Sequence, residues 1–244
     1  MQRIPAFIVA AVLSSACSLA QSQLDQIWQT VTTSKTDPAV ASLSNDKITA
    51  GLKEALKLST RKAVAATGKR DGFLKNEAIK IQLPEKLRTA GKGLRLMGMG
   101  PQLDELEIGM NRAAEQATPL AKQIFFNALL KMSIDDARNI LTGSDTAATE
   151  YFRRQSSGEL TTAFKPIVHR AMQNVGVIKQ YNQLMQTSVA APLLQTQGFD
   201  LDNYVVGKTL DGLFYMLGQE EKQIRKNPVA RTTTLLREVF GTRP

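Results

Sequence analysis

Few side chains in this sequence have the types and spacing that chemistry on a substrate requires. His169 is the only histidine and Cys17 the only cysteine, so the usual nitrogen and sulfur ligands of a transition metal are missing. No Gly-x-Ser-x-Gly nucleophile elbow and no Gly-Lys-Ser/Thr phosphate loop occurs. A lone histidine beside Ile167 and Val168 is more typical of a packed or surface residue than of a catalyst. We therefore expect no metal and no cofactor, and we assign no catalytic residue.

Two polar groups are the best remaining candidates for a site. Arg112 and Glu115 lie three residues apart on an otherwise apolar helical segment, where they could pair. Arg225 and Arg231 flank an asparagine–proline corner, from which an arginine could reach a carboxylate or an anionic ligand. Glu221 and Arg225, four residues apart, are expected to form a surface pair. We favour structural ion pairs here; the alternative is an envelope enzyme using carboxylate or arginine chemistry on a glycan or lipid.

Positive charge is concentrated in one part of the chain. The net charge is +9, and residues 47–95 alone contain 13 Lys and Arg against 4 Asp and Glu. Lys53, Lys57 and Arg61 recur every four residues and form one basic ridge, opposite an apolar stripe. That stripe contains Ile48, Leu52 and Leu56. The ridge favours an anionic partner, namely a lipid, a glycan or an envelope protein, and a merely solvated face is the alternative.

Nucleic acid is a poor match for this basic region. Phe73 is the only aromatic residue between positions 47 and 95, so bases would find little to stack on. We therefore expect no nucleic-acid partner.

The first twenty residues have the order of an export signal. Arg3 precedes an apolar run from Ile4 to Leu13, and small residues follow up to Ala20. The run is too short for a bilayer, which needs roughly twenty residues. Cleavage before Gln21 is the favoured interpretation and gives a periplasmic protein with no transmembrane segment. Cleavage before Cys17, which would then carry a lipid anchor, is the alternative.

The rest of the chain shows helical periodicity with clear stops between segments. Residues 21–44 predict a short amphipathic helix and a linker, and residues 45–241 predict one helical domain. Pro166 is expected to kink or split the helix that contains it. Residues 79–83 alternate apolar and polar, but one such run without a partner makes no sheet. The fold class expected is all-α: a single-domain, irregular array of about ten helices.

Four segments resemble a known family. They are KRDGFLKNEAIKIQLPEKL from Lys69, MNRAAEQA from Met110, IDDARNILTGSDTAATEYF from Ile134, and DGLFYMLGQEEKQIRKNPVARTTTLLREVFG from Asp211. Together they resemble a bacterial exported family known as domain of unknown function 4197, over about Gly51 to Gly241. The resemblance implies export, a bacterial source and one continuous domain, but no activity, ligand or site residue. Function stays open at this point; we favour a non-enzymatic envelope protein that binds an anionic or apolar partner through a helical groove or basic face.

Overall fold

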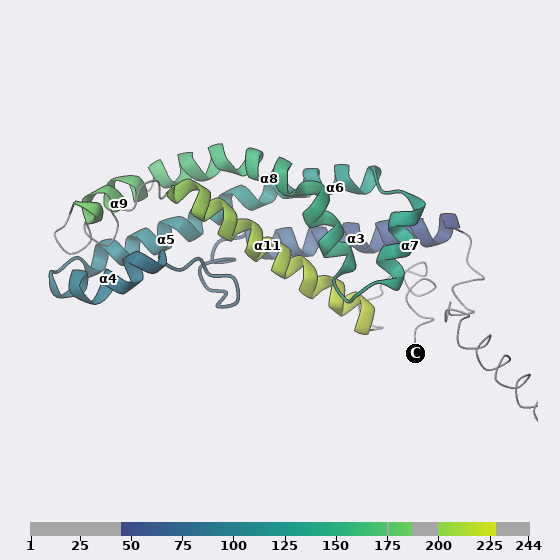
Figure 1. The fold of residues 1–244 in the computed structure, drawn as a ribbon, viewed down its shortest axis with the longest axis horizontal. Helices are drawn as coiled ribbons and strands as arrows, with labels where there is room; N and C mark the ends of the chain where they lie inside the picture. Colours follow the sequence, from purple (N-terminus) through teal and green to yellow (C-terminus); the bar gives the residue numbers. More distant parts are fainter. Residues whose placement is uncertain (1–44, 175, 187–199, 228–244) are drawn as a thin grey trace, which may run out of the picture. The chain divides into compact units, whose positions relative to one another are not determined.

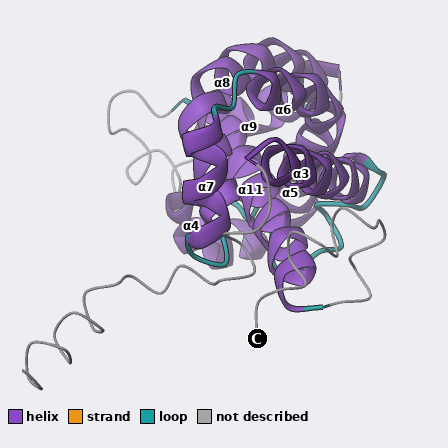
Figure 2. Cartoon of the chain, turned by 90° about the vertical axis from the view of Figure 1, so that its right-hand side faces the viewer, coloured by secondary structure: helices purple, strands orange, loops and turns teal. Residues whose placement is uncertain are grey.

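The chain forms helices throughout the part that the computed structural model describes, which is residues 45–174, 176–186 and 200–227 (Figures 1 and 2). Eight α-helices and one 3-10 turn lie within these ranges, and no strand does. They are α3 (Asn45–Gly68), α4 (Glu85–Leu96), α5 (Gly100–Ala117), η1 (Thr118–Leu120), α6 (Ala121–Leu130), α7 (Ile134–Thr142), α8 (Ala147–Asn174), α9 (Val177–Met185) and α11 (Leu201–Lys226). The expected all-α class is confirmed. The predicted export signal, the segment 21–44 and the end of the predicted helical domain, residues 228–241, lie outside the described residues.

Several helix ends are set by local side chains. Ser133 and Asp136 form a reciprocal capping box at the start of α7, and Gly143 ends that helix. Asp200 accepts a hydrogen bond from the backbone N–H of Asn203 and so caps α11. Such ends can be read from the sequence, because capping depends only on residues within one turn.

The split allowed for at Pro166 does not occur. The sequence leaves a kink or a split open at this proline, and α8 runs unbroken from Ala147 to Asn174 with Pro166 inside it. Pro166 is exposed, whereas Phe164 and Val168 on either side of it are fully buried. Burial of the apolar face therefore holds the helix together across the one backbone hydrogen bond that proline removes.

The core lies where α11 passes between its neighbours. This helix packs against α3 on one side and α8 on the other, and α8 also packs against α5 (Figure 1). Phe125 of α6 lies 4.9 Å from Phe152 of α8 and 5.8 Å from Phe214 of α11, measured between ring centroids. These rings connect three helices. By contrast, α4 packs chiefly on α5, so its outer face stays available at the surface.

Candidate functional site

The alternating run at residues 79–83, which predicts an extended segment, overlaps a segment that lies outside any helix or sheet and is called the strap, defined here as residues 80–84. Asn111 of α5 takes the place of a partner strand. Its Oδ1 accepts a hydrogen bond from Ile81 N–H at 2.8 Å, and its Nδ2 donates to Ile81 C=O at 2.8 Å. Asn111 and Ile81 are both buried, so this amide satisfies two backbone groups that water cannot reach.

Two further contacts fix the strap. Lys80 pairs with Glu107 at 2.7 Å, and the hydrogen bond to that carboxylate raises the pKa of Lys80. The Tyr204 hydroxyl of α11 donates to the Gln82 carbonyl at 2.9 Å, and burial raises the pKa of Tyr204, which keeps it a donor. The strap is therefore held by α5 on one side and α11 on the other.

The Arg112–Glu115 pair exists and holds the turn that precedes the strap. Arg112 contacts Glu115 at 2.7 Å and Asp71 at 2.5 Å. The other Glu115 oxygen accepts hydrogen bonds from the backbone N–H groups of Phe73 and Leu74. Hydrogen bonds from Lys75 and then Arg112 lower the pKa of Asp71. The pair is thus engaged in folding the turn onto α5.

Two surface pockets flank the strap and share Lys80, Gln82, Leu83 and Arg88. The first has a volume of about 330 Å³ and extends along α4 and α5. Its other lining residues are Glu77, Gly91, Lys92, Arg95, Leu103 and Glu107. The second has a volume of about 340 Å³ and extends to α11. Its other lining residues are Glu85, Tyr204 and Lys208. Basic side chains outnumber acidic ones in both.

The basic side chains of these pockets differ in how far they are neutralised. Lys80 is paired with Glu107, and Arg95 with Asp104 at 2.5 Å, a contact that lowers the pKa of Asp104. Arg88 donates instead to the Gln82 side chain at 2.8 Å. Within the described ranges neither Arg88 nor Lys92 has a carboxylate partner. These two cations, one turn apart on α4, are the part of the site best able to attract an anion.

The predicted basic ridge lies elsewhere, on α3. Its apolar stripe is buried, Lys57 and Arg61 are exposed, and Lys53 is half-buried. The Arg61 guanidinium lies 5.8 Å from the centroid of the Phe126 ring. None of the three ridge residues lines either strap pocket, so the structure presents two separate basic surfaces.

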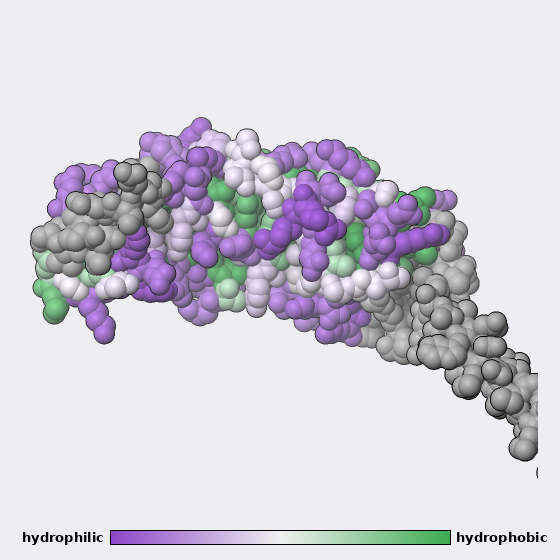
Figure 3. Space-filling view, in the orientation of Figure 1, coloured by the Kyte–Doolittle hydropathy of each residue, from purple (hydrophilic) through white to green (hydrophobic). Residues whose placement is uncertain are grey.

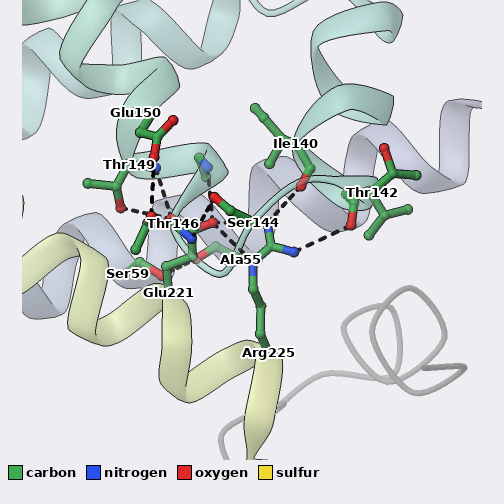
Figure 4. Close-up of polar contacts among 12 residues, drawn as sticks. Ala55, Ser59, Ile140, Thr142, Ser144, Thr146, Thr149, Glu150, Glu221 and Arg225 are labelled. Carbon is green, nitrogen blue, oxygen red and sulfur yellow. Dashed lines mark hydrogen bonds and ion pairs between the residues drawn. The ribbon is translucent and has the colours of Figure 1, made fainter. Parts of the chain in front are cut away.

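The expectation of a surface pair at Glu221 and Arg225 is wrong, because both side chains are buried, with 5% and 3% of their surface exposed (Figure 4). Glu221 accepts hydrogen bonds from the backbone N–H groups of Ala148 and Thr149 at the start of α8. Arg225 donates to the Ile140 carbonyl near the end of α7 at 2.7 Å. The pair, called the clasp below, satisfies the ends of two helices inside the protein. Arg225 therefore reaches back to a carboxylate, and it lies away from the strap pockets.

His169, a remaining polar candidate in the described part of the chain, contacts two other side chains. His169 Nδ1 lies 2.6 Å from Asp202 Oδ2, and its Nε2 lies 2.9 Å from the Gln173 amide. No group of three or more His, Cys, Asp or Glu side chains there is placed to hold a metal ion. No helix in these ranges is long and apolar enough to cross a bilayer. Arg231 lies outside the described residues.

The sequence reasoning missed Arg88 and Lys92. Their spacing of four residues matches that of the ridge on α3, so periodicity alone gives the two surfaces equal weight. What distinguishes Arg88 and Lys92 is the pocket wall behind them, and that wall depends on the long-range contact between Asn111 and Ile81. A sequence feature that could have pointed to this site is Asn111, a polar residue in an otherwise apolar helix.

Comparison with known proteins gives a family and no further relative. No curated protein and no solved structure matches the chain. The model of the family described as "Protein of unknown function (DUF4197)" matches residues 42–241, which is most of the chain, and the protein therefore belongs to this family.

Proposed function

We propose that this protein is an exported, non-enzymatic protein of the bacterial envelope that binds an anionic partner at the strap pockets. Export rests on the N-terminal sequence pattern, with Gln21 as the first residue of the mature chain. The observation that carries the binding proposal is the pair Arg88 and Lys92, which line a pocket of about 330 Å³ without a carboxylate partner in the described ranges.

The chemistry of these pockets suits a phosphate or carboxylate group. An arginine guanidinium offers a planar fork of donors for such groups, and a lysine adds a compact positive charge. Leu83 and Leu103 give the first pocket apolar wall as well. Pockets of small-molecule sites start at roughly 300 Å³ and combine apolar walls with a few polar groups. The arrangement therefore fits an anionic group attached to an apolar body.

The contacts of two carboxylates, Glu115 and Glu221, support the proposal that the protein is not an enzyme. Both oxygens of Glu115 are occupied, by Arg112 and by two backbone N–H groups. Both oxygens of Glu221 are occupied by Arg225, by the N–H groups of α8 and by the Thr149 hydroxyl. A carboxylate saturated in this way is held in one place and has no free oxygen to take a proton from a substrate.

A charge-reversal experiment tests the proposal. Inorganic tripolyphosphate, a soluble polyanion, is titrated into the mature chain by isothermal titration calorimetry at low and high salt. We expect binding that weakens with salt. The Arg88→Glu/Lys92→Glu variant should bind about tenfold more weakly or worse, which corresponds to 1.4 kcal/mol or more. Both side chains are exposed, so the fold should tolerate the change.

The ridge supplies a matched control. Lys57→Glu/Arg61→Glu changes the net charge by the same amount on exposed positions of α3. It should leave the affinity within about twofold of the parent, apart from the long-range effect that salt screens. Equal losses in the two variants, or a loss in the ridge variant alone, would contradict the assignment of binding to the strap pockets.

A further inference from the structure

The exposed face of α4 carries the pocket cations Arg88 and Lys92 and ends with an apolar residue, Leu96. Leu87, Ala90, Gly91 and Leu94 form the buried face of this helix. Arg88, Lys92 and Leu96 follow one another at intervals of four residues on the opposite face, where all three are exposed. A single helix face therefore carries two cations of the pocket and then a leucine one turn further on.

The turn after α4 exposes two adjacent apolar side chains, called the tip below. Leu96 is 90% exposed and Met97 is 51% exposed. Gly98, with φ of 80°, ends the helix and lets the chain turn back into α5. Figure 3 shows a small hydrophobic area at this end of the α4–α5 hairpin, with near-neutral surface beside it and hydrophilic surface further along the hairpin. Leu96 and Met97 thus form a small exposed apolar pair directly after the basic face of α4, and the charges around it indicate which partner it suits.

Charge complementarity selects the kind of partner. Along α4, Lys86, Arg88, Lys92 and Arg95 stand against the single acid Glu85. The carboxylates of the adjoining end of α5 are engaged, Asp104 with Arg95 and Glu105 with Gln180 of α9. Two apolar side chains fall far short of the roughly 800 Å² per partner that a stable protein interface buries. At a lipid surface, by contrast, a small inserted apolar area acts together with the attraction between basic side chains and anionic head groups.

We infer that the tip inserts into an anionic lipid surface and that the phosphate of a lipid head group is the anion received by Arg88 and Lys92. The inference rests on the proposed function and names the partner of the same site. Leu96 and Met97 enter the boundary between head groups and acyl chains. Lys92 then lies about one helix turn and Arg88 about two turns from Leu96, toward the level of the head groups, where phosphates are found.

Vesicle binding tests the inference with the whole mature chain. Partitioning onto vesicles of phosphatidylglycerol and phosphatidylcholine is compared with partitioning onto phosphatidylcholine alone. The parent should bind only the anionic vesicles. Leu96→Gln/Met97→Gln should bind them about tenfold more weakly or worse, because it removes the inserted apolar groups. Its affinity for tripolyphosphate should equal that of the parent, since the pocket cations are untouched.

The opposite end of the described helical body offers a matched control. Leu130 and Ile134, beside the α6–α7 turn, are 77% and 43% exposed, close to the values of the tip. Leu130→Gln/Ile134→Gln should bind anionic vesicles as the parent does. A direct reading comes from Leu96→Trp in a Trp28→Phe background, since Trp28 is the only tryptophan. Its emission should shift to shorter wavelength with anionic vesicles.

The outcomes separate this inference from the proposed function. If the parent binds tripolyphosphate but not anionic vesicles, or if the tip variant binds vesicles as well as the parent, the inference is overturned and the proposed function stands. If the tip variant dissociates an oligomer that the parent forms, the tip is a contact between copies and the inference is again overturned. If the parent binds neither probe, both fail.

Discussion

Glu221 and Arg225 show how much of the fold can depend on two side chains. The clasp gives the N–H groups at the start of α8 and the carbonyls at the end of α7 their partners, and both of its side chains are buried (Figure 4). Leaving one charge of a buried pair alone is far more costly than losing an exposed pair. The two kinds of pair can therefore be told apart by mutation.

Glu221→Gln should lower the free energy of unfolding by about 3 kcal/mol or more, because Arg225 is left with an uncompensated buried charge. Asp104→Asn is the control, since it also removes one carboxylate charge from an arginine pair. Its pair with Arg95 has side chains that are 52% and 58% exposed, so the loss should stay below about 1 kcal/mol. Urea unfolding followed by circular dichroism measures both. Equal costs would contradict the structural role given to the clasp.

The clasp also marks the limit of prediction from sequence at this scale. The spacing of Glu221 and Arg225 on one helix predicts their contact, because helix geometry is local. Their burial depends on the α7–α8 connection folding over that face of α11, eighty positions away in the chain. The same division applies to Arg112, whose contact with Glu115 follows from the spacing while its contact with Asp71 does not. Local pairs were predictable, and their surroundings were not.

At the scale of elements, α11 must approach the turn before the strap closely. A Cβ atom added at Gly212 would lie 2.6 Å from Phe73 Cε1 and 3.1 Å from Ile79 Cβ. Phe73 is fully buried, so its ring has no room to move aside. Gly207, five residues earlier on the same helix, is exposed and has no neighbouring atom within 4 Å of such a Cβ. Packing against the turn therefore requires a glycine at position 212 of α11, whereas position 207 of the same helix has room for a larger residue.

The same substitution should therefore have opposite effects at these positions. Gly212→Ala should lower the free energy of unfolding by about 1–3 kcal/mol through overpacking. Gly207→Ala should raise it by about 0.5–1 kcal/mol, because alanine is the better helix former. Thermal melts of the two variants beside the parent give the signs directly. A stabilising Gly212→Ala would mean that Phe73 and Ile79 do not pack on α11.

The elements themselves were predicted unevenly. Ser133 with Asp136, and Asp200, identify helix starts, because a cap requires a particular side chain at a particular offset. The split allowed for at Pro166 is absent, because burial of Phe164 and Val168 keeps α8 continuous. The strap was predicted as extended, but its partner was not, because a single asparagine side chain imitates a strand. Tertiary contacts decided both cases.

At the scale of the whole described body, the core and the candidate site are separate. The Phe125, Phe152 and Phe214 rings join α6, α8 and α11, whereas the pocket cations and the tip belong to α4, which packs chiefly on α5. An element attached through one neighbour can open without unfolding the rest. We therefore expect α4 to exchange its amide hydrogens through a local opening, and α8 and α11 only through global unfolding.

Two substitutions, one in the core and one between α4 and α5, should reveal this difference by hydrogen exchange. Phe125→Leu destabilises the native state and the form with α4 open to the same extent, so the exchange rate of α4 should not change. Exchange in α8 and α11, which requires global unfolding, should become about tenfold faster for each 1.4 kcal/mol of stability lost. Leu94→Ala removes a fully buried contact between α4 and α5, which destabilises only states in which α4 is closed. It should therefore speed exchange in α4 as well as in α8 and α11. If Phe125→Leu accelerates exchange equally in α4, α8 and α11, then α4 unfolds only together with the core. The tip would in that case approach a lipid surface as part of one rigid body.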